Sequence, residues 1–327
     1  MTVTPMLTLA VDDRAAGSRP TDQPAEAEAP LIGLLRVSNA LDLRWTLGPL
    51  RHGSGDPSVR FGAASIWRAT RTPDGPATMR LAMSTEGVEA TVWGPGREWA
   101  MNAIPRLIGE QDRPADLRPA HAVVRELQRR FAGLRFGRTD ALLEALVPAV
   151  IEQKVTGTEA RRSYRALLLA KGKAAPGPAG LVLPPSAEAL HVTPYYGFHP
   201  FGLEQRRALT LRRLGAPAAH LDKAATLPPA DALAYLRSIP GIGPWTAAEA
   251  ARVALGDPDA VSVGDFHVPN LVCWALAGEP RGDDQRMLEL LEPYRGQRAR
   301  VVRLLELSGI RAPRYGPRLA PRSIARI

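Results

Sequence analysis

One carboxylate of the sequence stands where it could take part in chemistry. Asp265 follows Gly264 and comes just before Phe266, at which the residue pattern predicts that a helix begins. An ionised carboxylate near a reacting carbon can stabilise positive charge in the transition state and can orient or activate a water molecule. Aspartate is also a preferred N-cap residue. Taken alone, Asp265 is therefore better explained as a helix cap than as a catalytic group.

A glycine-rich turn ends 22 residues before Asp265, at Gly243. Residues 239–244 read Ile-Pro-Gly-Ile-Gly-Pro, and Pro244 suits the first position of a new helix. Gly241 and Gly243 permit positive φ and carry no side chain that would hold off an approaching surface. Backbone amides of the turn and of the new helix would then face outward, where they could bind a phosphate oxygen. An ordinary helix–helix connection would need only one glycine.

The turn and the carboxylate together carry a specific resemblance. The string 236–248 resembles the DNA-binding helix-hairpin-helix, an element that non-enzymatic DNA-binding proteins also use. Together with the helix, the short loop and the Gly-Asp entry to a further helix, it resembles the HhH-GPD superfamily of base-excision DNA glycosylases. The resemblance implies that Asp265 is catalytic. It also implies that four residues of the hairpin bind DNA, namely Gly241, Ile242, Gly243 and Thr246.

The chemistry implied by this resemblance is cleavage of the bond between a base and its sugar. Breaking an N-glycosidic bond leaves positive charge on C1′ and on the ring oxygen, which Asp265 would stabilise. His267 could orient Asp265, although a surface or core histidine is the simpler interpretation. Bifunctional members of the superfamily have a lysine two residues after the last hairpin glycine, where this chain has Trp245. Because no lysine follows Lys223, we predict a monofunctional glycosylase that has no lyase activity.

Within the superfamily the chain resembles the bacterial DNA-3-methyladenine glycosylase II (AlkA-like) group over residues 30–310, most specifically over 236–276. That group stacks a flipped, positively charged alkylpurine against aromatic side chains, which is a cation–π contact. The resemblance therefore implies an alkylated purine as the substrate and places Trp245 in the base pocket. Glu249 stands one helical turn later, where the group has a tyrosine, and it could contact the base or pair with Arg252 at the surface.

Since this aromatic sandwich is incomplete, two alternatives stay open. One is a glycosylase for oxidised, deaminated or mismatched bases. The other is a non-catalytic module that recognises damaged or distorted DNA. The cluster of aromatic residues at 195–201 could pack between helices or line the pocket, and the sequence does not separate these two roles.

Two further features follow from the resemblance. The helix over 149–156 resembles the segment that enters the minor groove, where Gln153 and Lys154 replace the usual apolar wedge. They could hydrogen-bond the orphan base, bind phosphate, or form a solvated helix end. The superfamily also binds a monovalent sodium or potassium ion through hairpin carbonyls, which here would belong to Arg237, Ile239 and Ile242. No other cofactor is expected to be required.

The elements that must position these residues indicate an α+β fold. A leader over 1–29 without periodicity precedes a small antiparallel-sheet domain over 30–115, followed by an all-helical domain over 116–309 and a basic tail over 310–327. Alternating apolar and polar residues predict strands at 31–37, 66–71, 77–83 and 88–93. Apolar spacing of three to four residues predicts helices at 100–108, 121–131, 140–154, 158–171, 203–214, 230–238, 244–255, 266–276, 284–291 and 298–307. Residues 174–185 read as a connector rich in proline and glycine.

Composition agrees with a polyanionic partner. The 327 residues carry 42 Lys+Arg against 33 Asp+Glu, a formal net charge of +9, and only four of the cations are lysines. Such an excess favours double-stranded DNA, although an arginine-biased composition with a solvated surface would look the same. Cys273 is the only cysteine, which excludes an intrachain disulfide and a four-cysteine iron–sulfur cluster. With no signal peptide or membrane-length apolar run, the expectation is a cytoplasmic, nucleoid-associated monomer.

Overall fold

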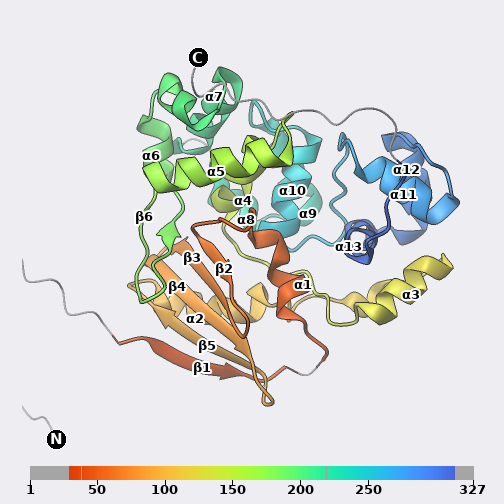
Figure 1. The fold of residues 1–327 in the computed structure, drawn as a ribbon, viewed down its shortest axis with the longest axis horizontal. Coiled ribbons are helices and arrows are strands. Elements are labelled where there is room, and N and C mark those ends of the chain that lie inside the picture. The colour runs from red at the N-terminus through yellow and green to blue at the C-terminus, as the bar shows by residue number, and fades with distance from the viewer. Residues whose placement is uncertain (1–28, 38, 218–219, 314–327) are drawn as a thin grey trace, which may run out of the picture.

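An antiparallel sheet and a larger helical region make up the described chain. The computed structural model describes residues 29–37, 39–217 and 220–313. The sheet lies at one end of the molecule, and the helices lie above it and to one side (Figure 1). The predicted α+β class is therefore confirmed. The predicted leader and most of the predicted basic tail lie outside the described residues.

The five strands form one sheet in the order β1-β5-β4-β3-β2, and each pair is antiparallel. Their bounds are β1 (Leu31–Leu35), β2 (Val59–Phe61), β3 (Ile66–Thr72), β4 (Gly75–Met83) and β5 (Val88–Trp93). Val88, Ala90 and Val92 alternate with outward residues on β5 and are fully buried. They pack against α2 (Arg97–Leu107), whose Ile104 is also fully buried.

Two pieces of this region were not predicted from the sequence. The short helix α1 (Leu43–Leu47) is capped by Asp42, whose carboxylate accepts the amides of Arg44 and Trp45. The strand β2 has only three residues. Segments this short give too few apolar positions for a period to be recognised.

The helical region has eleven α-helices within the described residues. They are α3 (Ala122–Arg130), α4 (Leu142–Ile151), α5 (Gly157–Lys171), α6 (Ala187–Val192), α7 (Gln205–Leu214), α8 (Leu221–Thr226), α9 (Pro229–Ser238), α10 (Pro244–Ala254), α11 (Val268–Ala277), α12 (Asp284–Leu291) and α13 (Arg298–Ser308). The expected helices are present with bounds within three residues of those predicted. The short helices α6 and α8 were not predicted.

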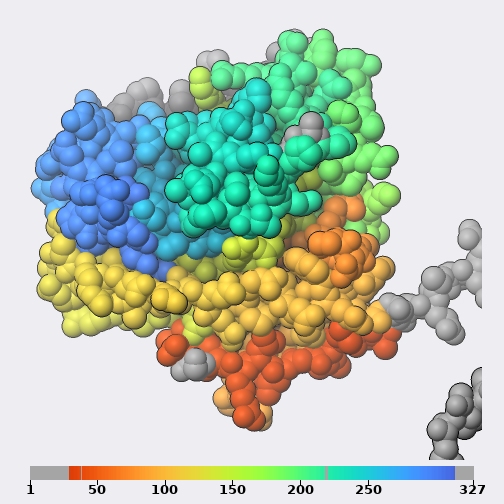
Figure 2. Space-filling model, turned by 180° about the vertical axis from the view of Figure 1, so that it is seen from behind, coloured from red at the N-terminus to blue at the C-terminus, as the bar shows by residue number. Residues whose placement is uncertain are grey.

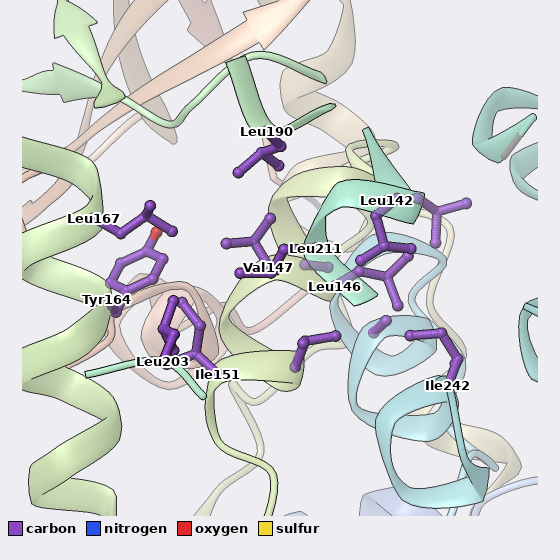
Figure 3. Packing of buried hydrophobic residues seen from close by; sticks show 14 of the residues in the cluster. Leu142, Leu146, Val147, Ile151, Tyr164, Leu167, Leu190, Leu203, Leu211 and Ile242 are labelled. Atoms are coloured by element: carbon purple, nitrogen blue, oxygen red, sulfur yellow. The ribbon is translucent and has the colours of Figure 1, made fainter. Parts of the chain in front are cut away.

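The helices enclose two separate hydrophobic cores. The larger core gathers residues of α4, α5, α7 and α10, and α4 lies at its centre with eight buried residues. Figure 3 shows Tyr164 and Leu167 of α5 on one side of this core and Ile242 at its opposite edge, near Leu142 and Leu146. Ile242 is 5% exposed. The side chain of Ile242 thus anchors the hairpin tip in the core.

The second core joins helices that are far apart in the sequence. Val124 and Leu127 of α3 pack with Val272 of α11, Leu291 of α12 and Leu305 of α13. Figure 2 shows the same relation from behind, with the yellow residues that follow the sheet running beneath the blue C-terminal helices. The first helix of the helical region, α3, therefore packs against its last three helices, α11, α12 and α13.

Residues 174–185, predicted as a connector without secondary structure, are partly ordered as strands. They contain a two-stranded hairpin made of β6 (Lys173–Ala174) and β7 (Val182–Leu183). Leu181 and Leu183 are buried against Ala69 of β3, and the amide of Val182 donates to the carbonyl of Pro57. The helical region is thus not strictly all-helical. No helix of the described residues is long and apolar enough to cross a membrane.

Candidate active site

The hairpin between α9 and α10 uses its two glycines differently. Gly241 has φ +100°, and a Cβ there would lie 2.2 Å from the hydroxyl oxygen of Thr210 on α7. Gly243 has φ −90°, and a Cβ there would meet nothing within 4 Å. A glycine is therefore required at position 241, because a side chain there would collide with Thr210. At position 243 no protein atom would be hit, so the lack of a side chain keeps the backbone accessible from outside.

Backbone amides at the start of α10 face this open surface. Pro244 has no N–H, and the amides of the partly exposed Gly243 and Trp245 have no acceptor among the described residues. Free amides at a helix N-terminus combine with the helix dipole to favour an anion. The hairpin can thus hold a phosphate group by main-chain contacts alone.

Two side chains that were predicted to bind DNA hold the hairpin in place. The amide nitrogen of Gln153, just after α4, donates to the carbonyl of Gly241 at 3.0 Å and to the hydroxyl of Thr246 at 2.9 Å. Thr246 is 2% exposed. The buried side chain of Thr246 is therefore not free for DNA, whereas the DNA-binding role of the half-buried Gln153 stays a prediction.

Lys154 differs from its neighbour Gln153. It is exposed and has φ +56°, a left-handed conformation that is uncommon for a residue with a side chain. Its ammonium group therefore remains available for phosphate contact on the hairpin side of the molecule. That DNA-binding role stays a prediction.

The carboxylate of Asp265 is fixed at both oxygens. Oδ2 accepts the indole N–H of Trp245 at 2.9 Å. Oδ1 accepts the amides of His267 at 2.6 Å and Val268 at 2.9 Å. The helix α11 starts at Val268, two residues later than predicted, and Asp265 bonds its first turn. The structural and chemical interpretations of Asp265 are thus compatible, since a half-buried carboxylate can cap a helix and still present charge to a ligand.

His267 does not orient Asp265 through its imidazole. Only its backbone amide reaches the carboxylate, and the exposed imidazole packs edge-on against Phe266 with ring centroids 5.0 Å apart. We also expected His267 to contribute to the base pocket, and that role stays a prediction. The neighbouring side chain of Phe266 is 79% exposed. Nothing in its residue type or spacing had indicated a function.

Glu249 takes part in an ion-pair network. Its carboxylate accepts hydrogen bonds from Arg252, 2.6 Å away, and from the hydroxyl of Ser262. Arg252 also lies 3.9 Å from Glu306 of α13, which pairs with Arg303 at 3.2 Å. The predicted pairing with Arg252 is therefore present, but the pair is largely buried and not a solvated surface pair.

The charge of Arg252 is maintained by its neighbours. Burial would lower the pKa of its guanidinium, but the carboxylates of Glu249, Glu306 and Asp265 outweigh burial and raise that pKa above its ordinary value. Nothing in the sequence separated Arg303 and Glu306 from ordinary surface charges.

A cavity of about 280 Å³ lies between the sheet region and the helices. All four charged residues of this network line it, together with Trp45 and Arg68 from the sheet region. Trp245 and Asp265 do not line the cavity. Trp245 lies one helical turn before Glu249 on α10, so that the residue that holds Asp265 and a residue that lines the cavity are neighbours along this helix.

The aromatic cluster that follows α6 does not line this cavity. It forms a 3-10 helix, η3 (Tyr195–Phe201), in which Phe198 is fully buried in the larger core. Tyr195 and Tyr196 are exposed and contact each other edge-on, with centroids 5.7 Å apart. Of the two roles that the sequence left open, packing between helices is the one that the structure supports.

The carbonyls of Arg237, Ile239 and Ile242 are the oxygens that we expected to bind a monovalent cation. The carbonyl of Ile239 accepts the amide of Ile242 at 3.0 Å, whereas those of Arg237 and Ile242 have no donor among the described residues. The C-terminus of α9 adds partial negative charge at this point. The carbonyls of Arg237 and Ile242 therefore have lone pairs that a small cation could use. No group of three His, Cys, Asp or Glu side chains that could hold a metal occurs in the described chain.

Comparison with known proteins gives similarity in structure only. No protein-family model and no curated protein sequence matches the chain. It is similar to the 3-methyladenine DNA glycosylase of Archaeoglobus fulgidus, with a TM-score of 0.71 and 20% identity over 84% of this chain and 97% of that chain. It is also similar to the 8-oxoguanine glycosylase/lyase of Clostridium acetobutylicum solved with double-stranded DNA, with a TM-score of 0.66 and 14% identity over 87% of this chain and 96% of that chain.

A third similar structure is the Schizosaccharomyces pombe 3-methyladenine DNA glycosylase Mag1 in complex with abasic DNA. Its TM-score is 0.50, with 18% identity over 62% of this chain and 98% of that chain. At these identities the comparisons establish the fold. The chain has the fold of helix-hairpin-helix DNA glycosylases, as the sequence resemblance predicted.

Proposed function

We propose that this protein is a monofunctional DNA glycosylase, which removes a damaged base from double-stranded DNA by hydrolysis of its N-glycosidic bond. One observation carries the proposal. The carboxylate of Asp265 is held by Trp245 and by two backbone amides, beside a hairpin whose free amides face outward. The fold that the chain shares with known DNA glycosylases supports the same reaction.

The chemistry follows from the charge at the reacting carbon. As the bond from C1′ to the base lengthens, positive charge develops on C1′ and the ring oxygen. A fixed anion next to that carbon stabilises the charge without having to reorganise, and it can orient the attacking water. The hairpin amides and Lys154 would hold the DNA backbone, since phosphate contacts position a protein on DNA without reading its sequence.

The absence of lyase activity is part of the proposal. A lyase step needs an amine that attacks C1′, and Trp245 occupies the position that a lysine has in bifunctional relatives. Borohydride should therefore trap no covalent complex between the wild-type protein and DNA. The variant Trp245→Lys serves as the positive control, because it places an amine next to Asp265. A trapped wild-type complex would refute the monofunctional assignment.

Two classes of damaged base are supported by different observations. Trp245 beside Asp265 favours an alkylated purine, the class named for the Archaeoglobus fulgidus and Schizosaccharomyces pombe proteins. The charged cavity wall at Glu249 and Arg252 favours a base with polar edges. Both classes are compatible with the catalytic arrangement at Asp265.

The decisive experiment replaces Asp265 by asparagine. Asp265→Asn keeps the size of the side chain and an oxygen for Trp245, but it removes the charge. Base release under single-turnover conditions should fall by roughly 10²–10³-fold, while affinity for abasic-site DNA stays within about threefold. Asp74→Asn, in the exposed turn of the sheet, is the matched control. If no damaged duplex loses a base even with the wild-type protein, the alternative of a non-catalytic DNA-binding module is correct.

We also propose that a single copy of the protein acts on DNA and that a sodium or potassium ion binds the carbonyls of the hairpin. The ion would strengthen the positive potential where the phosphate binds. DNA affinity should then be higher in potassium or sodium chloride than in tetramethylammonium chloride at equal ionic strength. Equal affinity in the three salts would exclude the ion, and a light-scattering mass of two chains on DNA would exclude the monomer.

A further inference from the structure

Four charged side chains form one wall of the cavity, and we call them the charged quartet. They are Glu249 and Arg252 of α10 and Arg303 and Glu306 of α13. Each is largely buried, with side-chain exposures between 17% and 28%. Burying ion pairs brings little or no gain in stability over well-packed apolar residues. Stability alone therefore does not account for four charges on one cavity wall.

The quartet adjoins the proposed reaction centre. Glu249 accepts a hydrogen bond from Ser262, which belongs to the same loop as Asp265. Trp245 bonds Asp265, and Glu249 follows Trp245 after one turn of α10, a rise of about 6 Å. That rise is comparable to the length of a nucleobase. A base whose C1′ lies at Asp265 would thus reach the wall that carries the quartet.

The quartet is electrically neutral as a whole but rich in directional groups. Two guanidinium groups and two carboxylates leave no net charge to attract a cation. The buried Nε of Arg303 has no hydrogen-bond partner among the described residues. A buried donor without a partner costs free energy, so an acceptor on a bound ligand would be favoured there. Arginine and carboxylate side chains suit the carbonyl and N–H groups on a base edge.

The aromatic rings that line the cavity, among the described residues, do not form a parallel pair, since the planes of His52 and Tyr164 are tilted by 58° and those of Trp45 and its neighbour Phe131 by 82°. Trp45 contacts Phe131 edge-on at 4.9 Å, and Tyr164 packs against His52 at 4.8 Å. Phe136 has the guanidinium of Arg300 over its ring at 4.7 Å. A cation–π sandwich around a charged base needs two ring faces that lie opposite each other. The lining residues therefore provide no aromatic sandwich.

We infer that the charged quartet reads the extruded base, and that the preferred base is an electrically neutral one with polar edges, such as an oxidised or deaminated base. A cationic N-alkylpurine would be the poorer substrate. This inference rests on the proposed glycosylase function and narrows its substrate class. Recognition by hydrogen bonds can discriminate strongly, because a base that lacks the right groups leaves buried polar atoms unpaired.

The first test compares lesions in otherwise identical duplexes. Single-turnover base release is measured for 8-oxoguanine, hypoxanthine and uracil as neutral bases and for 7-methylguanine as the cationic base. At least one neutral base should be released roughly tenfold faster than 7-methylguanine. If 7-methylguanine is released fastest, the inference is wrong while the glycosylase function stands. If no base is released in a manner that depends on Asp265, the proposed function itself fails.

The second test asks whether the quartet sets this preference. Arg252→Met keeps the length of the side chain but removes its donors, and it should lower the ratio of neutral-base release to 7-methylguanine release by roughly tenfold. Glu249→Gln, which keeps the shape, should shift the same ratio if Arg252→Met does not fold. Arg295→Met removes an exposed ion pair with Glu292 outside the cavity and should leave the ratio unchanged. Equal losses for all lesions in the quartet variants would mean a merely structural role and would overturn the inference.

Discussion

The indole Nε1 of Trp245 lies 2.9 Å from Oδ2 of Asp265, and this contact joins the first turn of α10 to the loop before α11. One oxygen of the carboxylate thus accepts a hydrogen bond from the indole, and the other accepts hydrogen bonds from two backbone amides. Trp245, which stands where bifunctional relatives have a lysine, thus also holds the carboxylate that we propose to be catalytic.

Removal of this donor should slow the reaction without preventing folding. In Trp245→Phe an aromatic ring is kept, but the carboxylate of Asp265 loses the hydrogen bond that the indole N–H donates to Oδ2. Base release should fall by roughly tenfold in single-turnover rate, because the carboxylate is no longer held in one orientation. DNA affinity measured by fluorescence anisotropy should change little. Trp93→Phe, a stacked tryptophan of the sheet, is the control. An unchanged release rate would show that the amides of His267 and Val268 suffice.

The two hairpin glycines should respond to substitution in opposite ways. Gly241→Ala forces a methyl group against Thr210 at positive φ and should lower the free energy of unfolding by about 1–3 kcal/mol. Gly243→Val meets open space, so the melting temperature should stay within about 2 °C. DNA affinity should nevertheless fall several-fold, because the side chain separates the free amides from a phosphate. Thermal unfolding and anisotropy of both variants test the pair, and normal DNA binding by Gly243→Val would refute the proposed phosphate contact.

Phe266 should contribute to DNA binding in a manner that does not depend on salt. Its ring is 79% exposed beside Asp265, on the surface where the proposed function places DNA. Phe266→Ala should weaken binding several-fold and leave the slope of affinity against salt unchanged, because no charge is lost. Lys154→Ala should instead reduce that slope by about one. Ile32→Ala, 80% exposed on β1, is the control that should change neither quantity.

Stability should depend on pH through the buried carboxyl of Asp257. Burial raises its pKa, although the amide of Asp259 opposes the shift. An acid whose folded-state pKa is raised contributes stability below its ordinary pKa of about 4, and that contribution is lost as the pH rises through the folded value. Asp257→Asn keeps the acceptor oxygen but never ionises. The melting temperature of this variant should therefore rise relative to that of the wild type as the pH increases above about 4. A difference that does not change with pH would contradict the assignment.

Much of the fold could be predicted because its signals are local. The strands around the turn at 73–74 follow from alternation, and the start of α10 follows from Pro244 after a glycine. Short elements such as α1 and the β6–β7 hairpin were missed, since they depend on contacts with the helical region or with β3. The aromatic residues of η3 were recognised as a cluster, but their structural role was not predicted. That role depends on which of the rings is buried in the core.

By itself, the sequence determined the hairpin, the carboxylate 22 residues after its last glycine and the tryptophan in place of a lysine, because these are properties of residue type and spacing in one short segment. Only the tertiary structure decided which side chains face one another. Gln153 meets Thr246 across 93 positions of the chain, and Arg252 meets Glu306 across 54. Such contacts depend on how helices pack and rotate against each other, and single-chain periodicity does not encode that rotation.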